Sequence, residues 1–247
     1  MKKLVIIPTY KERENAQQIL KAIYDLEQNF HVLIIDDNSP DGTADIVKTI
    51  QQENQDRLFL IERPGKLGLG TAYITGFQWA LAHNYDFIFE MDADFSHDPN
   101  DLNRLFLACS KGTADVAVGS RYVNGGEFEN WPLSRKIISM GGALYSRLIT
   151  WIPVHDPTAG FVCYKKEVLA AMNLLEIKSI GYAFQIEMKF AAWKLGFKIA
   201  EVPIVFKDRA FGSSKMTKGI IKEGIRGVLA LQKEFLMGRY VKRVKNK

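Results

Sequence analysis

Two aspartates, separated by one residue in Asp92-Ala93-Asp94, follow the apolar run Phe87-Ile88-Phe89. Two carboxylates at a strand end can reach the same hard cation, and Mg²⁺ or Mn²⁺ commonly bridges such carboxylates to substrate phosphates. An Asp-x-Asp segment alone is weakly specific, because polar turns often contain one. Its place after a buried strand, with Pro99 closing the following turn, favours a metal and phosphate site.

Two further segments could bind a nucleotide. Asp36 and Asp37 follow another apolar run, and their carboxylates could accept hydrogen bonds from ribose hydroxyls or base N–H groups. Adjacent acids repel each other unless a ligand or nearby donors offset the repulsion. The glycine-rich residues 65–70 match neither a Walker A motif nor a dinucleotide fingerprint. They could let the backbone approach a nucleotide with Lys66 near a phosphate, although a plain turn fits equally well.

Basic residues in the second half of the chain could bind phosphate. Arginine forks match phosphate geometry, and four cations lie near loops or Gly/Ser-rich stretches, namely Arg121, Arg135, Arg209 and Lys215. Each alone fits a solvated surface position, but as a set they suit a diphosphate. Asp156, in the polar turn 155–160, could lie near the reacting centre or cap a sheet.

Short apolar runs alternate with helical patterns along the chain, and this alternation predicts the scaffold that holds these residues. We expect strands at 4–7, 32–35, 58–61, 87–91 and 116–119, separated by helices at 14–26, 43–52, 70–83 and 100–109. Continuous apolar strands between helices predict an α/β fold with a mostly parallel sheet covered on both faces. Ligands of such sheets bind beyond the carboxyl ends of the strands, where the polar segments fall.

The pattern changes near Asn124. Residues 133–152 indicate one or two amphipathic helices, 181–195 another helix, 199–205 a late strand and 220–240 a long final helix. We expect a catalytic domain over residues 1–217 and an amphipathic, basic C-terminal helix within 218–247.

Bulk properties narrow the function classes. The chain has 247 residues, 47% hydrophobic and 25% charged, which is typical of a globular protein. Its two cysteines, Cys109 and Cys163, are far apart and lack metal spacing, which predicts a reduced, cytoplasmic protein. A net charge of +5 favours phosphate-bearing or anionic-surface partners. No nucleic-acid motif is recognised, so we expect no nucleic acid partner.

Seven stretches, in order, resemble the inverting glycosyltransferases of family 2 with the GT-A (Rossmann-like) fold, and within them the dolichyl (polyprenyl) phosphate mannose synthases. The stretches are IPTYKE (7–12), DDNSPDGT (36–43), KLGLGTA (66–72), DADFSH (92–97), GSRY (119–122), DPTAGF (156–161) and GSSKM (212–216). The resemblance implies metal-dependent transfer of mannose from GDP-mannose to polyprenyl (dolichyl) phosphate, with inversion and with Mg²⁺ or Mn²⁺ as cofactor.

The resemblance also implies roles for individual residues. The catalytic group would be Asp92, Asp94, Arg121 and Arg209. The donor nucleotide would be bound by Pro8, Tyr10, Glu12, Asp37, Lys66, Gly68, Asp92, Ala93, Asp94, Arg209 and Lys215. The acceptor phosphate would be bound by Arg121, Arg135 and Ser139. The metal would be bound by Asp92, Asp94 and Ser96. Two departures are that Ser96 stands where some members have a glutamine ligand, and that Val162 replaces an arginine.

A polyprenyl phosphate would lie in a bilayer, so the resemblance implies a membrane-associated enzyme. Residues 133–152 and the final helix combine apolar stripes with basic edges, which suits peripheral association with the cytoplasmic face of a membrane. Docking through a small membrane subunit is an alternative, and so is packing of both stripes on the core.

Other functions remain open from the sequence. The nearest is a transferase of the same fold that uses UDP-glucose or another sugar nucleotide, with polyprenyl phosphate or a glycan as acceptor. A non-catalytic nucleotide-binding module is a distant alternative. A nucleotidyltransferase is disfavoured, because Pro8-Thr9-Tyr10 replaces the expected glycine-rich N-terminal turn.

Overall fold

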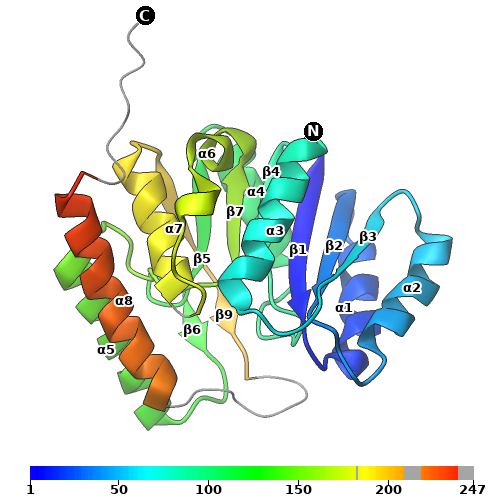
Figure 1. Cartoon of the computed structure of the whole chain (residues 1–247), viewed down its shortest axis with the longest axis horizontal. Helices are drawn as coiled ribbons and strands as arrows, with labels where there is room; N and C mark the ends of the chain where they lie inside the picture. Colours follow the sequence, from blue (N-terminus) through cyan, green and yellow to red (C-terminus); the bar gives the residue numbers. More distant parts are fainter. Residues whose placement is uncertain (182, 209–217, 239–247) are drawn as a thin grey trace, which may run out of the picture.

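A seven-stranded sheet forms the centre of the computed structural model, which describes residues 1–181, 183–208 and 218–238 (Figure 1). The strand order is β3-β2-β1-β4-β7-β5-β8. The bounds are β1 Lys3–Thr9, β2 Phe30–Asp36, β3 Leu58–Glu62, β4 Phe87–Glu90, β5 Val116–Ser120, β7 Val162–Lys165 and β8 Ile199–Pro203. All neighbouring strands run parallel except β7, which is antiparallel to β4 and β5. The predicted fold class is confirmed.

Helices cover both faces of the sheet because successive strand residues point to opposite sides. In β1, Val5 and Ile7 join a core cluster on one face, whereas Leu4 and Ile6 join a cluster on the other. The first face is covered by α1 (Arg13–Tyr24), α2 (Thr43–Glu53) and α4 (Asp101–Ser110). The second face is covered by α3 (Leu69–Ala82), α6 (Lys166–Ala171) and α7 (Ala183–Lys194).

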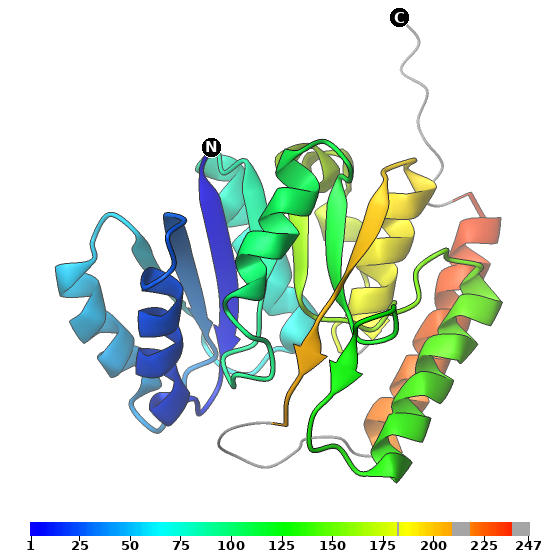
Figure 2. The same cartoon turned by 180° about the vertical axis from the view of Figure 1, so that it is seen from behind.

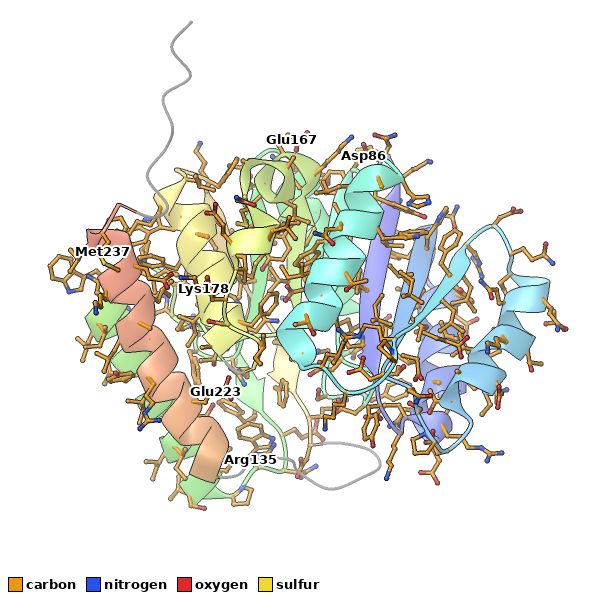
Figure 3. All side chains as sticks on the ribbon, viewed as in Figure 1. Asp86, Arg135, Glu167, Lys178, Glu223 and Met237 are labelled. Atoms are coloured by element: carbon orange, nitrogen blue, oxygen red, sulfur yellow. The ribbon has the colours of Figure 1, made fainter. Side chains whose placement is uncertain are left out.

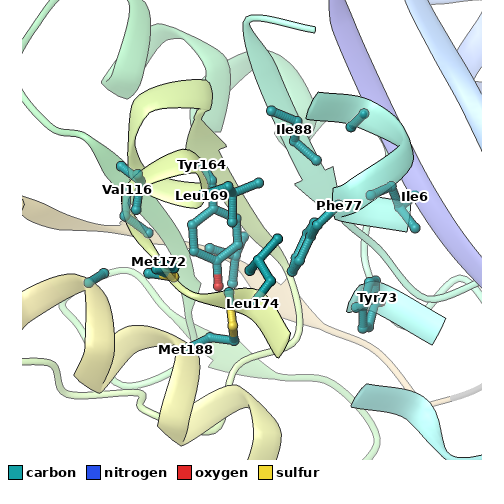
Figure 4. Packing of buried hydrophobic residues seen from close by; sticks show 14 of the residues in the cluster. Ile6, Tyr73, Phe77, Ile88, Val116, Tyr164, Leu169, Met172, Leu174 and Met188 are labelled. Atoms are coloured by element: carbon teal, nitrogen blue, oxygen red, sulfur yellow. The ribbon is translucent and has the colours of Figure 1, made fainter. Parts of the chain in front are cut away.

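The close-up of the second face shows how α3, β7, α6 and α7 pack (Figure 4). Tyr164 of β7 is fully buried and meets Phe77 of α3 edge-on, with ring centroids 5.6 Å apart. Met172 and Leu174, around the short 3₁₀ helix Leu174–Glu176, complete this cluster together with Met188 of α7. The cluster places α7 directly against the sheet, below the carboxyl end of β4.

Strand β7 was not expected from the sequence. The run from Phe161 to Tyr164 is short and follows a polar turn, so it lacks the strand–helix rhythm of the first half. The strand fills the place between β4 and β5 and puts Val162 beside Glu90. The expected late strand also divides, because Ile204 separates β8 from β9 (Val205–Phe206), which pairs with β6 (Glu127–Phe128) in a small second sheet.

Helices α5 (Leu133–Thr150) and α8 (Lys218–Leu236) lie side by side at the end of the molecule opposite α2 (Figures 1 and 2). The Tyr145 hydroxyl of α5 donates to the Ile225 carbonyl of α8 at 3.2 Å. Val228 and Leu231 of α8 are buried in a third core cluster with Ile186 and Phe190 of α7. Within the described ranges, none of the helices has both the length and the apolar composition needed to cross a bilayer.

Helix α5 is a single helix, and its end has a local cause. Trp151 adopts a left-handed conformation with φ +58° while its N–H bonds to the Arg147 carbonyl, and Pro153 follows. A left-handed residue and a nearby proline both stop helix propagation.

Candidate active site

A cavity of about 460 Å³ lies at the carboxyl edge of the parallel strands. It is lined by residues that follow β1, β2, β4 and β5, as the strand-end rule predicts. Figure 3 labels two wall residues at this edge, Arg135 of α5 and Glu223 of α8. The predicted residues that the structure brings to this wall are Pro8, Tyr10, Glu12, Asp37, Lys66, Gly68, Asp92, Ala93, Asp94, Arg121 and Arg135.

Two described residues among those predicted, Ser96 and Ser139, do not line this cavity. Ser96 is buried, and its backbone N–H donates to Asp94 Oδ1 at 3.1 Å. Ser139 is buried on α5, with its hydroxyl 2.7 Å from the Tyr122 hydroxyl. Arg209 and Lys215 lie outside the described residues, so their roles stay predictions.

The acidic pair is held by its own turn. Asp94 is buried, Asp92 is half-buried, and both reach the cavity wall. His97 packs its ring on Phe161, with centroids 4.8 Å apart, and its Nδ1 lies 3.3 Å from the Asp92 backbone nitrogen. Burial lowers the pKa of His97 to about 4, so the ring is neutral at pH 7. A neutral ring can accept the Asp92 N–H at Nδ1 while Nε2 carries the proton.

The pair suits a hard divalent cation. Two carboxylates offer the oxygen ligands that Mg²⁺ and Mn²⁺ prefer, and both face the same cavity. In the part of the chain that the structure describes, no set of three His, Cys, Asp or Glu side chains could hold a metal. A cation at Asp92 and Asp94 would therefore complete its shell with diphosphate oxygens and water.

The two adjacent acids after β2 differ in their surroundings. Asp36 is fully buried and accepts hydrogen bonds from the hydroxyls of Thr9, at 2.8 Å, and Ser39, at 2.6 Å. Asp37 reaches the cavity wall and accepts from Arg63 Nε at 2.6 Å. Burial raises the pKa of Asp37, although the guanidinium of Arg63 opposes that rise. These donors offset the repulsion expected from the sequence, and only Asp37 is placed to meet a nucleotide.

Arg63 joins three segments of the nucleotide side and was not singled out in the sequence. Besides Asp37, its guanidinium bonds to the Thr71 hydroxyl at 2.7 Å and to the Gly68 carbonyl at 3.3 Å. The signal that could have found it is its place directly after β3. Gly68 has φ +100°, and a Cβ at Gly70 would lie 2.6 Å from the Ser179 carbonyl oxygen. Both positions therefore require glycine.

Tyr10, Lys66 and Glu12 complete the nucleotide side of the wall. The Lys66 ammonium lies 4.9 Å from the centroid of the Tyr10 ring, an attractive cation–π distance. Glu12 Oε2 accepts from the Asn15 side chain at 2.8 Å. A flat aromatic ring, a mobile cation and a fixed carboxylate are groups that can recognise a base, a phosphate and a ribose.

The cations on the opposite wall have protein partners. Arg121 forms a two-pronged ion pair with fully buried Asp156, at 2.7 and 2.6 Å, and bonds to the Thr158 hydroxyl at 2.8 Å. Burial alone would raise the pKa of Asp156, but the Arg121 charge lowers it below its usual range. Arg135 pairs with Asp208 at 2.9 Å and lies 3.8 Å over the Trp131 ring. Both guanidinium groups are thereby held in place before any anion arrives.

Gln185 of α7 also lines the cavity and was missed, as were His97, Thr158 and Gly160. Its side chain is held by Glu90 and Lys189, both fully buried. Burial raises the pKa of Glu90 to about 8 and lowers the pKa of Lys189 to about 8. The signal available in the sequence was a polar residue inside the apolar run Ala183-Phe184-Gln185-Ile186.

Comparison with known proteins identifies the family. Residues 4–172 match the model of glycosyl transferase family 2. The chain is 44% identical over 234 residues to the polyprenol monophosphomannose synthase of Mycolicibacterium smegmatis, covering 92% of this chain and 88% of the relative. It is 45% identical over 228 residues to the undecaprenyl-phosphate mannosyltransferase of Micrococcus luteus, covering 92% and 93%. The chain belongs to glycosyl transferase family 2. It is a glycosyltransferase, and its resemblance to the polyprenyl phosphate mannose synthases is confirmed.

Solved structures support the fold of this family 2 glycosyltransferase. Glucosyl-3-phosphoglycerate synthase from Mycobacterium tuberculosis, in complex with Mn²⁺, uridine-diphosphate and phosphoglyceric acid, matches with a TM-score of 0.68. The identity is 15%, and the match covers 94% of this chain and 78% of that one. This likeness confirms the expected GT-A fold.

Proposed function

We propose that this glycosyltransferase moves mannose from GDP-mannose to a polyprenyl phosphate, with inversion at the anomeric carbon. The observation that carries the proposal is the identity of 44% and 45%, over 92% of the chain, to two proteins named for mannosyl transfer to polyprenol or undecaprenyl phosphate. The cavity supports it, because an acidic pair lies between a nucleotide-suited wall and a wall with two arginines.

The donor would lie with its guanosine against Pro8, Tyr10, Glu12 and Asp37. Guanine presents two adjacent donors, N1–H and the 2-amino group, which a carboxylate can accept. Asp37 is suited to this task because Arg63 holds it in place from behind. Lys66 and Gly68 would then face the diphosphate, and the predicted contacts of Arg209 and Lys215 belong to the same group of phosphates.

A divalent cation, Mg²⁺ or Mn²⁺, would be held by Asp92 and Asp94 and would neutralise charge that develops on the leaving diphosphate. The Asp-x-Asp turn would hold it rigidly, since His97 and the Ser96 N–H bind this turn. A solved protein of this fold, glucosyl-3-phosphoglycerate synthase, is in complex with both Mn²⁺ and uridine-diphosphate, which supports the proposed use of a divalent cation.

The attacking group would be the acceptor's phosphate monoester. Its second pKa is near 6, so it is largely ionised at neutral pH and needs no strong general base. It needs positioning and relief from repulsion by the donor's diphosphate. Arg121 and Arg135 supply positive charge on the opposite wall, held there by Asp156 and Asp208. A phosphate oxygen would form the new bond to the anomeric carbon as the bond to GDP breaks.

The test is a donor panel. The purified enzyme is given a polyprenyl phosphate, Mg²⁺ or Mn²⁺, and GDP-mannose, GDP-glucose, UDP-glucose or UDP-N-acetylglucosamine, and products are identified by mass. We expect polyprenyl phosphate mannose from GDP-mannose, lost on addition of EDTA and restored by the metal. Product from a UDP-sugar but not from GDP-mannose would overturn the donor assignment.

We further propose that α5 docks on the surface of an anionic bilayer. Six apolar side chains form one exposed stripe along α5 at helical spacing, from Leu133 through Ile137, Met140, Leu144 and Leu148 to Trp151 at its end. Leu148 is 64% exposed and Trp151 76%. The stripe begins within one turn of Arg135, which lines the cavity. An acceptor held in a bilayer would thus meet the catalytic site where this stripe starts.

Helix α8 fits in part the alternative that its apolar stripe packs on the core. Its apolar side is split, since Val228 and Leu231 are buried in the core whereas Ile225, Leu229 and Leu236 are exposed. Removal of residues 219–247 would expose that core cluster, so truncation is an unsuitable test of membrane binding. Substitutions in the α5 stripe leave the core intact.

Flotation on vesicles that contain anionic phospholipid tests the docking proposal. The triple variant Ile137→Ser, Leu144→Ser, Leu148→Ser should lower vesicle binding by more than about tenfold, because each change removes apolar carbons that the bilayer would bury. The control is Leu107→Ser, Leu175→Ser, two exposed leucines away from α5, which should bind as the parent does. Unchanged flotation of the triple variant would exclude α5 as the docking surface, and membrane association only with a second protein would favour a subunit.

A further inference from the structure

Three polar side chains form a closed group beneath the cavity floor. Gln185 Nε2 donates to Glu90 Oε2 at 2.6 Å, and Lys189 Nζ donates to Gln185 Oε1 at 3.1 Å. Lys189 also bonds to the carbonyls of Ala159, at 2.6 Å, and Gln185, at 3.0 Å. Glu90 and Lys189 are fully buried, and Gln185 is 4% exposed. Burying polar and ionisable side chains costs free energy, so the arrangement that this group holds in place is a candidate for a function.

The group fixes the orientation of one amide. A glutamine amide can flip by half a turn, but here the oxygen meets an ammonium and the nitrogen meets a carboxyl group, so only one orientation makes both bonds. The nitrogen carries two hydrogens, and Glu90 accepts one of them. Gln185 lines the cavity, so an amide of fixed direction lies beside any ligand bound there.

Space is left open beside that nitrogen by a glycine. A Cβ added at Gly160 would lie 3.8 Å from Gln185 Nε2 and 4.0 Å from His97 Cε1, so glycine keeps this space open. Asp92 and Asp94 lie on the same cavity wall. An uncharged amide donor beside two carboxylates suits a sugar hydroxyl better than a phosphate.

The fold gives Glu90 no alternative partner on the sheet. Its neighbour in register on β7 is Val162, which is fully buried and apolar. Glu90 Oε2 therefore meets α7, and its Oε1 has no hydrogen-bond partner among the described residues. Glu90 also precedes Asp92 by two residues. The end of β4 therefore carries both the acidic pair and the carboxyl group that holds the Gln185 amide.

We propose that Gln185 contacts the transferred sugar, donating a hydrogen bond from Nε2 to a hydroxyl of the donor's hexosyl group, with Glu90 and Lys189 as positioning residues. The proposal deepens the proposed function and rests on it only for the identity of the sugar. Gln185 would thus recognise the part of the donor that nucleoside diphosphate lacks.

The test separates sugar from nucleotide. Gln185→Met keeps the length of the side chain but removes the amide, and binding of GDP-mannose and of GDP is measured by calorimetry with Mn²⁺, beside steady-state transfer. We expect kcat/KM for GDP-mannose to fall about tenfold to a hundredfold, while the Kd of GDP changes less than about twofold. Gln78→Ala, an exposed glutamine on α3, is the control and should change neither.

A second pair of variants tests the positioning role. Glu90→Gln retains an oxygen acceptor for the Gln185 amide and should keep kcat/KM within about threefold, whereas Glu90→Leu should lose about as much as Gln185→Met. A merely structural network would instead weaken GDP and GDP-mannose binding equally. That equal loss, or unchanged kcat/KM in Gln185→Met, would overturn the inference, as would a rise confined to the KM of the polyprenyl phosphate.

Failure of the proposed function would look different. If the parent enzyme used another sugar nucleotide, the same comparison would be made with that donor and its own nucleoside diphosphate. The prediction for Gln185 would be unchanged, since it concerns the hexosyl group and not the base.

Discussion

The cavity at the strand ends and the outer face of α5 differ in how their side chains are partnered. Around the cavity, Asp37, Arg121 and Arg135 already have protein partners, so charges that would face a donor are held in position. Along α5, apolar side chains from Leu133 to Trp151 are left without cover. The contrast between held charges and uncovered apolar side chains is what the proposed binding of a charged donor at the cavity and the proposed docking of α5 on a bilayer would require. A water-soluble donor and a lipid acceptor require these two kinds of surface.

The largest effect should come from the acidic pair. Asp92→Asn and Asp94→Asn keep the shape of the turn but weaken the cation site, so transfer should fall by about a thousandfold or more. Rates with saturating GDP-mannose and Mn²⁺ measure this, and Asp45→Asn on the exposed side of α2 is the control. Vesicle binding should not change in any of the three variants. Undiminished transfer by Asp94→Asn would contradict the role of the acidic pair, and with it the contrast between the cavity and α5.

Arg63 should affect both stability and donor binding. Arg63→Met leaves Asp37 as a buried acid without its guanidinium, which should lower the free energy of unfolding by about 3 kcal/mol. Denaturant unfolding measures the loss, and calorimetry should show weaker GDP binding. The double variant Arg63→Met, Asp37→Leu should recover part of the stability but none of the GDP affinity. Recovery of both would mean that Asp37 is a structural residue only.

Two leucines on α8, one buried and one exposed, allow covered and uncovered apolar side chains to be compared within one helix. Leu231 is 5% exposed and Leu229 51%. Leu231→Ala should lower the free energy of unfolding by about 2–5 kcal/mol because it opens a cavity in the third core cluster. Leu229→Ala should change it by less than about 0.5 kcal/mol. Equal losses in denaturant titrations would show that the outer side of α8 is covered in solution.

A small effect is expected at the amino edge of the sheet, away from both surfaces. Burial alone would raise the pKa of Asp115, but the Lys198 N–H and the Lys165 ammonium hold it below 3.8. A lowered carboxyl pKa contributes stability that is present above the unfolded value and lost as pH falls through the folded value. Asp115→Asn should therefore cost less than about 1 kcal/mol at pH 7, and the difference should shrink below pH 3.8.

Acid unfolding of parent and variant, followed by circular dichroism, measures that difference. Transfer activity at pH 7 should be unchanged. A difference that grew toward low pH would contradict the sign of the pKa shift.

The sequence was most informative where local rules decide the structure. Runs such as Leu4–Ile7 and Val32–Ile35 are apolar throughout, so parallel strands and their polar ends could be predicted, and with them Asp92, Asp94 and Asp37. Arg135 was found because cations near a glycine-rich or loop segment suggest phosphate binding. The aspartates needed only spacing along the chain and the rule that strand ends meet at one edge, and Arg135 needed only its residue type and its place near a loop.

What the sequence could not show depends on contacts between distant segments. Strand β7 runs antiparallel because the chain enters it from the turn after α5, a route that its four residues do not encode. Gln185 and Glu90 are 95 positions apart, and their bond exists only because α7 packs on β4. The guanidinium of Arg121 was predicted to bind a phosphate, and only the fold reveals that this guanidinium is already paired with the carboxylate of Asp156.

The most direct test of the central claim is a crystal structure with GDP-mannose and Mn²⁺, with the cation located by its anomalous scattering. We predict a peak about 2.1 Å from carboxylate oxygens of Asp92 and Asp94 and from the donor's diphosphate. A cation bound elsewhere, or a donor bound with both aspartates turned away from its diphosphate, would contradict the account.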